Sequence, residues 1–408
     1  ATASEEEEGG ENGGTLDGGG VPHQVFTGAT LKVARLIGEY LYLMRLLPPV
    51  AHDAVLGLRE LLCYYLLLSA DLFTPPDMSG KSVQVGGGME MLRRGGGEGL
   101  QSLLRHIEAA RHIASLPILT CQAALKSPDA FFGLGERCVA IESLLFLVEV
   151  MQAVRVSLSQ LSVPKSASDV RSIYKEIVEH VAELREMMYS RFPHICISMP
   201  DIVNQIAYMK WDSKDLAQRH SQYVDLVHER FLQFFSALDQ MRKFLPDEMR
   251  PILLRASILH IMENLVEGYS RIRHVGPNTP LLMSNDINTL KSAMEMIPGM
   301  EDFGLKPLPF FTHVELFIKG YFLPPDSPQV MVEWAYQHPF YPPHQVLGLV
   351  QAVIESNSHH TSSFSALMKQ SKSKSTEVKR ILAQVEEAVR TNASPSSSMS
   401  LHALAVAR

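Results

Sequence analysis

Histidines are the first residues to consider for chemistry, because the sequence contains 16 of them. Zinc sites on helices use ligands four positions apart, as in HExxH, and the sequence has no such motif. His106 and His112 stand six positions apart, so a helix would place them on opposite faces. His359 and His360 are adjacent in a polar stretch. The spacing therefore does not predict a metal site.

The residue patterns of nucleophilic catalysis are also missing. There is no GxSxG motif, and the glycine triplets at 86–88 and 95–97 match neither GxGxxG nor GxxxxGK[ST]. Carboxylates such as Glu142, Glu149 and Glu263 are spread among apolar residues, which indicates solvated helix faces or local salt bridges. No catalytic residue is predicted, and an enzyme would need a cleft between helical subdomains that residue spacing does not reveal.

The four cysteines have apolar neighbours and form no CxxC pair. This pattern is typical of reduced, buried side chains in a cytosolic protein rather than of disulfides or metal ligands. The cysteines are Cys63, Cys121, Cys138 and Cys196.

One basic run near the C-terminus could contact an anionic surface. Its bases, which surround the single acid Glu377, are Lys369, Lys372, Lys374, Lys379 and Arg380. The run is either a solvated tail or a weak membrane contact, in which each charge would contribute about 1 kcal/mol. Both interpretations stay open, so these five residues are the candidate membrane-surface contacts.

The net charge of −7 arises at the N-terminus, where residues 1–20 carry six acids and no base. The rest of the chain balances 37 bases against 38 acids, which argues against a nucleic-acid partner. The longest apolar stretch, at 61–70, is half of the ~20 residues that a membrane-spanning helix needs. No signal peptide is visible, and the first residue is Ala rather than an initiator Met, which suggests a fragment or a trimmed chain.

Apolar residues recur at helical spacing along most of the chain, and no segment shows the sustained alternation of strands. The predicted fold is all-α, an elongated rod of stacked antiparallel helices. Helices are predicted at 30–47, 50–73, 100–115, 117–125, 131–160, 168–192 with Ser168 as N-cap, 200–209, 212–244, 250–275, 285–296, 310–321, 328–338 and 342–356.

We predict four parts in the chain. Residues 1–27 form a disordered acidic, Gly-rich tail, and residues 28–200 form a first helical subdomain with a flexible Gly-rich loop at 77–99. Residues 201–356 form a second helical subdomain. Residues 357–408 form a Ser- and Lys-rich tail that is mostly disordered, with a short helix at 376–390.

The predicted helix at 212–244 carries the longest apolar stripe. Its members step by three or four residues: Leu216, His220, Tyr223, Val227, Phe231, Phe234, Leu238 and Met241. A helix of this length would span roughly 50 Å, as in packed helical rods. Because its polar face lacks the Lys and Arg of membrane-binding helices, the stripe is interpreted as helix-to-helix core.

Several segments resemble the C-terminal domain of the syndetin family. The most specific is 204–225, which contains Asn204-Gln205-Ile206, Lys210-Trp211-Asp212 and Gln218-Arg219-His220-Ser221-Gln222-Tyr223-Val224-Asp225. Other matching blocks, in the same order as in the family, include Arg35-Leu36-Ile37, Ala140-Ile141-Glu142-Ser143-Leu144, Val266-Glu267-Gly268-Tyr269-Ser270-Arg271, Phe317-Ile318-Lys319-Gly320-Tyr321-Phe322-Leu323, and Trp334 with His338. The resemblance covers residues 28–356.

This resemblance implies a vesicle-tethering subunit that is not an enzyme and uses no cofactor. Syndetin is a subunit of the endosome-associated recycling protein complex (EARP), so the implied partners are the tethering subunits shared with the Golgi-associated complex (GARP), and SNAREs or small GTPases. The implied location is cytoplasmic, peripheral on recycling endosomes and the trans-Golgi network. In the family a coiled-coil half precedes this region, and the chain lacks it. A peripheral lipid-binding protein is the main alternative, followed by an enzyme.

Overall fold

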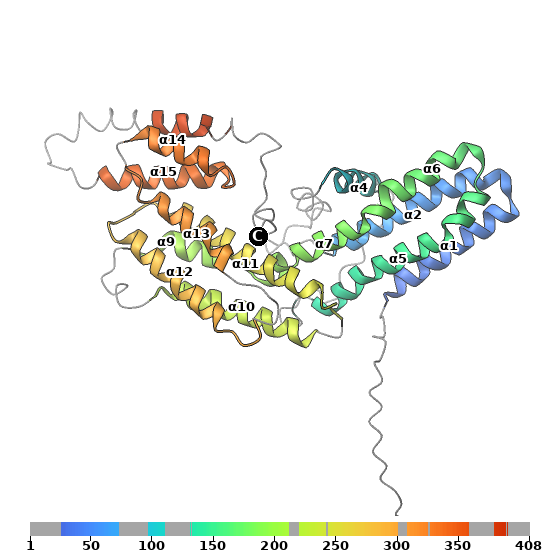
Figure 1. The fold of residues 1–408 in the computed structure, drawn as a ribbon, viewed down its shortest axis with the longest axis horizontal. Coiled ribbons are helices and arrows are strands. Elements are labelled where there is room, and N and C mark those ends of the chain that lie inside the picture. Colours follow the sequence, from blue (N-terminus) through green and yellow to red (C-terminus); the bar gives the residue numbers. More distant parts are fainter. Residues whose placement is uncertain are drawn as a thin grey trace, which may run out of the picture.

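The computed structural model describes residues 26–72, 97–110, 131, 133–211, 220–241, 244–300, 308–324, 327–358, 379–388 and 390. Every regular element in these ranges is helical, which confirms the all-α prediction. Figure 1 shows an elongated molecule, with α1 (Gly28–Leu46), α2 (Ala51–Asp71) and α5 (Leu134–Leu161) side by side at one end and α14 (Pro328–Gln337) and α15 (Pro343–Ser358) at the other. None of the helices in the described ranges combines the length and the apolar character that a bilayer crossing requires.

The helices predicted at 30–47 and 50–73 form a hairpin with a proline corner. The side chain of Thr27 caps α1 by accepting the backbone N–H of Thr30, at 3.1 Å. Pro48–Val50 makes a short 3₁₀ turn between α1 and α2, because proline suits the first turn of a helix but not its interior. The backbone N–H of Thr27 also donates to the Ser143 hydroxyl of α5, which ties the hairpin to the next helix.

The predicted start of α5 at residue 131 is wrong. Phe131 and Gly133 have left-handed backbone angles, with φ of 45° and 67°, so regular helix begins only at Leu134. α4 (Glu98–Ala109) begins within the predicted 77–99 loop, while residues 77–96 and the helix predicted at 117–125 lie outside the described residues. α4 packs against α2 and against the turns at 173–180. Its buried side chains are Leu100, Leu103, Leu104 and Ile107.

The segment predicted as one helix at 168–192 is helical without a break, but its hydrogen-bonding pattern changes along its length. It consists of α6 (Ala167–Ser172), a π turn at Ile173–Ile177, a 3₁₀ turn at Val178–His180 and α7 (Val181–Arg191). Ser166 occupies the N-cap position, so the prediction of Ser168 as N-cap is wrong. The short α8 (Pro193–Cys196) follows directly.

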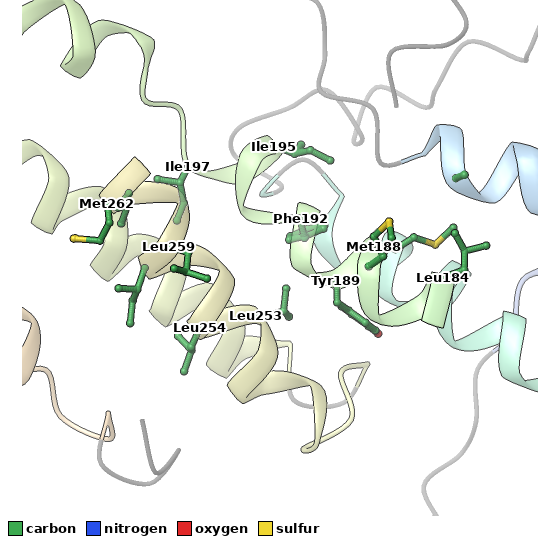
Figure 2. Close-up of a cluster of buried hydrophobic side chains, with 14 of the residues drawn as sticks. Leu184, Met188, Tyr189, Phe192, Ile195, Ile197, Leu253, Leu254, Leu259 and Met262 are labelled. Atoms are coloured by element: carbon green, nitrogen blue, oxygen red, sulfur yellow. The ribbon is translucent and has the colours of Figure 1, made fainter. Parts of the chain in front are cut away.

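The central helix is α11 (Met249–Ser270), which is buried on most sides and contacts α7, α8, α9 (Pro200–Tyr208), α13 (Leu308–Gly320) and α15. Figure 2 shows Met188 of α7 and Phe192 and Ile195 near α8 in the same apolar cluster as Leu253 and Leu254 of α11. The predicted boundary at residue 200 falls between α8 and α9, and α11 packs on both. The division into two subdomains stays a prediction.

The helix predicted at 212–244 is shorter than expected. α10 runs from Gln222 to Gln240, roughly 28 Å, while residues 212–219 lie outside the described residues. Ser221 is extended, and its backbone N–H donates to Asp286 of α12 (Thr279–Glu295) at 2.8 Å. His220 and Ser221 are not helical, so the prediction of one continuous helix over 212–244 is wrong.

The apolar stripe of α10 is core, as predicted. Its buried members in the helix are Tyr223, Val227, Phe231, Phe234 and Leu238, while Met241 is partly buried. Burial of each phenylalanine contributes roughly 1.5–3 kcal/mol. α10 packs on α9, α11 and α12, so the buried stripe joins α10 to three neighbouring helices.

Candidate functional site

Only part of the candidate membrane contact lies in the described residues. Lys369, Lys372 and Lys374 are outside them, while Lys379 and Arg380 lie in the helical residues 379–388 and have exposed side chains. The opposite side of this segment is apolar, with buried Ile381, Val385 and Ala388 four and three positions apart. The segment therefore keeps its two bases in solvent while its apolar side is covered.

Three aromatic residues from the matching blocks 204–225 and 266–271 come together in the second half of the molecule. The rings of Trp211, Tyr223 and Tyr269 form a triangle, with centroid distances of 6.0, 6.4 and 6.5 Å. The indole N–H of Trp211 donates to the backbone carbonyl of Ile206 at 3.1 Å. Aromatic pairs at these distances stabilise a core beyond their buried area. We call the matching blocks 204–225 and 266–271 the signature. Its aromatic residues therefore join the end of α9, the start of α10 and the end of α11.

A buried carboxylate lies at the centre of this cluster. Asp286 is 2% exposed and accepts the Ser221 backbone N–H at 2.8 Å and the Tyr223 hydroxyl at 2.9 Å. Burial raises the pKa of Asp286 above its ordinary value, and these hydrogen bonds oppose that rise. The Tyr321 hydroxyl donates to the backbone carbonyl of Tyr269 at 2.6 Å. All donors point to groups of the chain itself, so this polar centre acts as a structural tie.

Three glycines of the helices allow close approaches around this tie. A Cβ on Gly268 would lie 3.0 Å from Ile206, and one on Gly320 would lie 2.5 Å from Leu349. On Gly348 it would lie 2.1 Å from the backbone oxygen of Ser270. The contact at Gly348 is with backbone and excludes a side chain, whereas at Gly268 and Gly320 the neighbouring side chains of Ile206 and Leu349 would have to move.

Glu267 connects the end of α11 to the start of α15. It accepts hydrogen bonds from Arg271 at 2.8 Å and Gln345 at 2.9 Å, and its carboxylate lies 2.8 Å from the Nε2 of His344. Burial favours the neutral acid, but the three hydrogen bonds outweigh this and hold the pKa of Glu267 below its ordinary value. A carboxylate with this many partners is a fixed anchor rather than a proton carrier.

A second charged cluster lies between α5 and α7. Arg185 donates to both oxygens of Glu142, at 3.0 and 2.8 Å, and to Glu248 at 3.1 Å. The Tyr189 hydroxyl donates to Glu142 at 2.5 Å. The paired geometry is the strong form of an arginine–carboxylate contact. The salt-bridge interpretation of Glu142 is confirmed.

The histidines also have structural partners. His106 lies 2.8 Å from Glu176, while His112 is outside the described residues. His194 and His260 pack edge to face at 4.1 Å, and burial lowers the pKa of His194 to about 2 and that of His260 to about 4. Within the described ranges no three His, Cys, Asp or Glu side chains gather closely enough to hold a metal ion.

The described cysteines are free thiols in apolar surroundings. Cys63 and Cys138 are buried and Cys196 is half-buried, while Cys121 lies outside the described residues. Burial raises the pKa of the Cys63 thiol to about 11 and that of Cys138 to about 12. Such thiols stay protonated and unreactive near neutral pH.

One cavity of about 290 Å³ opens between the end of α11 and α15. It is lined by Tyr208, Ser270, Arg271, Ile272, Arg273, Gly348, Gln351, Ala352 and Glu355. Tyr208 and Ser270 bring hydroxyl groups to the lining, and the Ser270 hydroxyl donates to the backbone carbonyl of Glu267 rather than to a base. The lining offers groups for binding but no nucleophile next to a base. Residue spacing could not predict this cavity, because its walls are about eighty positions apart in the chain.

Comparison with known proteins agrees with the signature. The family model described as "Syndetin, C-terminal" matches residues 131–377. Syndetin of Rattus norvegicus is 27% identical over 347 residues, covering 82% of this chain and 35% of the relative. Syndetin of Gallus gallus is 27% identical over 361 residues, covering 84% and 36%. The chain thus spans about a third of the length of these curated relatives, and no solved structure matches it.

The matched range contains α5 to α15 and therefore the aromatic triangle, its buried carboxylate and the three close glycine contacts. The resemblance seen in the residues 204–225 and 266–271 is confirmed by this match. The chain belongs to the syndetin C-terminal family.

Proposed function

We propose that this chain is the C-terminal module of a vesicle-tethering subunit that acts in endocytic recycling and endosome-to-Golgi traffic through protein–protein contacts. The observation that carries the proposal is the family match over residues 131–377. A non-enzymatic role agrees with the arrangement of the ionisable groups, because Glu142, Glu267 and Asp286 are all occupied by partners within the fold.

The proposed partners are the tethering subunits shared with the Golgi-associated complex, together with SNAREs or small GTPases. The proposed location is the cytoplasmic surface of recycling endosomes and of the trans-Golgi network. A stack of helices suits this role, since long helical surfaces present many side chains to partner helices. The extended body in Figure 1 offers such surfaces along its length.

The test is affinity capture from cells that express the natural full-length protein with a tag. The shared tethering subunits should be recovered with it, and a version that lacks the region of this chain should lose the partners that bind here. Reproducible absence of the shared subunits from the full-length capture would contradict the proposal.

Peripheral membrane binding is the second candidate, and the exposed side chains of Lys379 and Arg380 favour it. Flotation with anionic vesicles would compare the chain with a variant in which the five bases of the run become Gln. A matched variant removes the same number of charges from exposed positions elsewhere, at Lys32, Arg45, Lys165, Arg171 and Lys175. Loss of binding in the first variant alone supports a membrane contact, and unchanged binding excludes the run.

A further inference from the structure

The cavity between α11 and α15 has walls of different chemistry. One wall is the segment that leaves α11, with Arg271 and Arg273 on either side of the buried Ile272. The other wall belongs to α15 and carries Gln351 and Glu355. Tyr208, at the end of α9, stands at the same cavity with its side chain 84% exposed. A phenol ring this exposed next to a cavity is a ready contact for a bound chain.

The floor of the cavity depends on a backbone contact. Gly348 of α15 lies so close to the carbonyl of Ser270 that a Cβ would be 2.1 Å from that oxygen. The Ser270 hydroxyl is turned inward and donates to Glu267. The floor therefore consists of backbone and small side chains, which leaves the space above it open.

The two arginines differ in how they are held. Arg271 is paired with Glu267, which is itself fixed by Gln345 and His344, so the position of this guanidinium is set before any ligand arrives. Arg273 is exposed and makes no ion pair with any residue in the described part of the chain. The fixed guanidinium of Arg271 and the ion-pair-free guanidinium of Arg273 together favour an anionic ligand. Each Arg presents several N–H donors to a carboxylate at once.

We propose that this cavity binds a segment of a protein partner through an acidic side chain, whose carboxylate is held by Arg273 and Arg271. Tyr208 covers the segment from the side. The Gln351 side-chain amide donates to Glu355, and its carbonyl oxygen faces the segment as an acceptor for a backbone N–H. The cavity volume of 290 Å³ is at the small end of ligand pockets, which hold about 300–1,000 Å³, so it suits one or two side chains rather than a large ligand.

The carboxylate is favoured over a lipid phosphate because of Glu355. This acid lies on the wall opposite the arginines and accepts a hydrogen bond from Gln351 at 2.8 Å. Two arginines and one glutamate give the lining a formal net charge of +1, which a single carboxylate neutralises and a phosphate with a charge of about −1.5 to −2 exceeds. An acidic peptide therefore fits the charges of the cavity better than an anionic lipid surface.

The site deepens the proposed tethering function, on which its biological meaning rests, by naming the chemistry of one partner contact. The test of this site is direct peptide binding. The cavity proposal can therefore fail while the capture of tethering subunits succeeds, and capture can fail while the peptide binds. The probe is a library of short synthetic peptides randomised around one fixed Glu, with a second library in which Gln replaces that Glu. The immobilised full chain is incubated with each library, and the retained peptides are counted by mass spectrometry.

The Glu library should be retained about tenfold better than the Gln library, as expected for a charge-assisted hydrogen bond. Arg273→Glu should abolish the preference, and Gln351→Trp should reduce retention by filling the cavity without removing an arginine. The matched control Arg45→Glu changes an exposed arginine of α1, at the other end of the molecule in Figure 1, and should leave retention unchanged. Circular dichroism checks that all variants fold.

Three results would overturn the proposal. The first is equal retention of both libraries, and the second is an equal loss in Arg45→Glu and Arg273→Glu, which would indicate attraction without a site. The third is flotation with phosphoinositide vesicles that Arg273→Glu abolishes while peptide retention stays unchanged, because the cavity would then bind a lipid headgroup.

Discussion

The hydroxyl groups of Tyr223 and Tyr269 lie 2.7 Å apart in the core, although the two residues are 46 positions apart in the chain. Tyr223 has one hydroxyl proton, which it donates to Asp286. The proton between the two tyrosines must therefore come from Tyr269. The chain of hydrogen bonds has a direction, from Tyr269 to Tyr223 to Asp286, and Tyr223 is its central member.

This direction predicts unequal effects of two similar substitutions. Tyr223→Phe removes a donor from Asp286 and also leaves the Tyr269 hydroxyl without an acceptor, so it should lower the free energy of unfolding by about 3 kcal/mol. Tyr269→Phe removes only the hydrogen bond that the Tyr223 hydroxyl accepts. The Tyr223 hydroxyl still donates to Asp286, so this variant should cost about 1 kcal/mol. Urea unfolding measures both. A larger cost for Tyr269→Phe would show that the direction is reversed.

The contact of Gly348 with Ser270 predicts a large effect of one methyl group. Gly348→Ala should lower the free energy of unfolding by roughly 2 kcal/mol or more, since its Cβ would lie 2.1 Å from a backbone oxygen that cannot move freely. Gly38→Ala is the matched control, because nothing lies within 4 Å of a Cβ at that exposed site in α1. Gly38→Ala should instead raise the melting temperature, because Ala is more favourable than Gly in a helix interior by about 1 kcal/mol. Similar effects at both sites would refute the close approach.

The buried arginine between α5 and α7 predicts a strong dependence on Glu142. Glu142→Ala would leave the Arg185 side chain, which is 7% exposed, with only the exposed Glu248, and would remove the acceptor of Tyr189. The expected loss is roughly 3 kcal/mol, typical of a buried charge that loses its partner. Glu39→Ala breaks the exposed Arg35 pair of α1 and should cost less than about 1 kcal/mol. Thermal unfolding of the two variants tests this contrast.

His260 predicts that the fold weakens as the solution becomes acidic. Burial lowers its pKa from 6.5 to about 4, and its Nε2 lies 2.9 Å from the carbonyl of Ile197. Between these two pH values the unfolded chain binds a proton that the folded chain does not, so stability is present above pH 6.5 and falls as the pH decreases toward 4. From pH 7 to pH 5 the loss from this group is about 2 kcal/mol.

Urea unfolding at both pH values should show this loss in the natural chain and a smaller one in His260→Gln, which cannot titrate. If the variant loses as much stability as the natural chain, His260 does not contribute to the pH dependence. His194 packs against His260 and has its pKa lowered in the same direction, to about 2, so part of the acid sensitivity should persist in the variant.

Helical periodicity and proline positions were sufficient to predict most helices, because both act over a few neighbouring residues. The pair Pro48 and Pro49 marks the α1–α2 corner in the sequence and in the structure. Geometry that depends on distant partners was not predicted. The late start of α10 is an example, since a carboxylate 65 positions away holds the Ser221 backbone outside the helix.

The amino-acid sequence by itself determined that this protein is helical, that the face of α10 from Tyr223 to Leu238 is apolar core, and that the chain carries the syndetin signature. Only the tertiary structure decided what the signature does. It brings Trp211, Tyr223, Tyr269 and Asp286 into one buried tie, and it places Arg273 beside a cavity whose second wall is α15. The physical reason is that burial and hydrogen-bond partners depend on which segments meet in space, and residue spacing records only which face of its own helix a residue occupies.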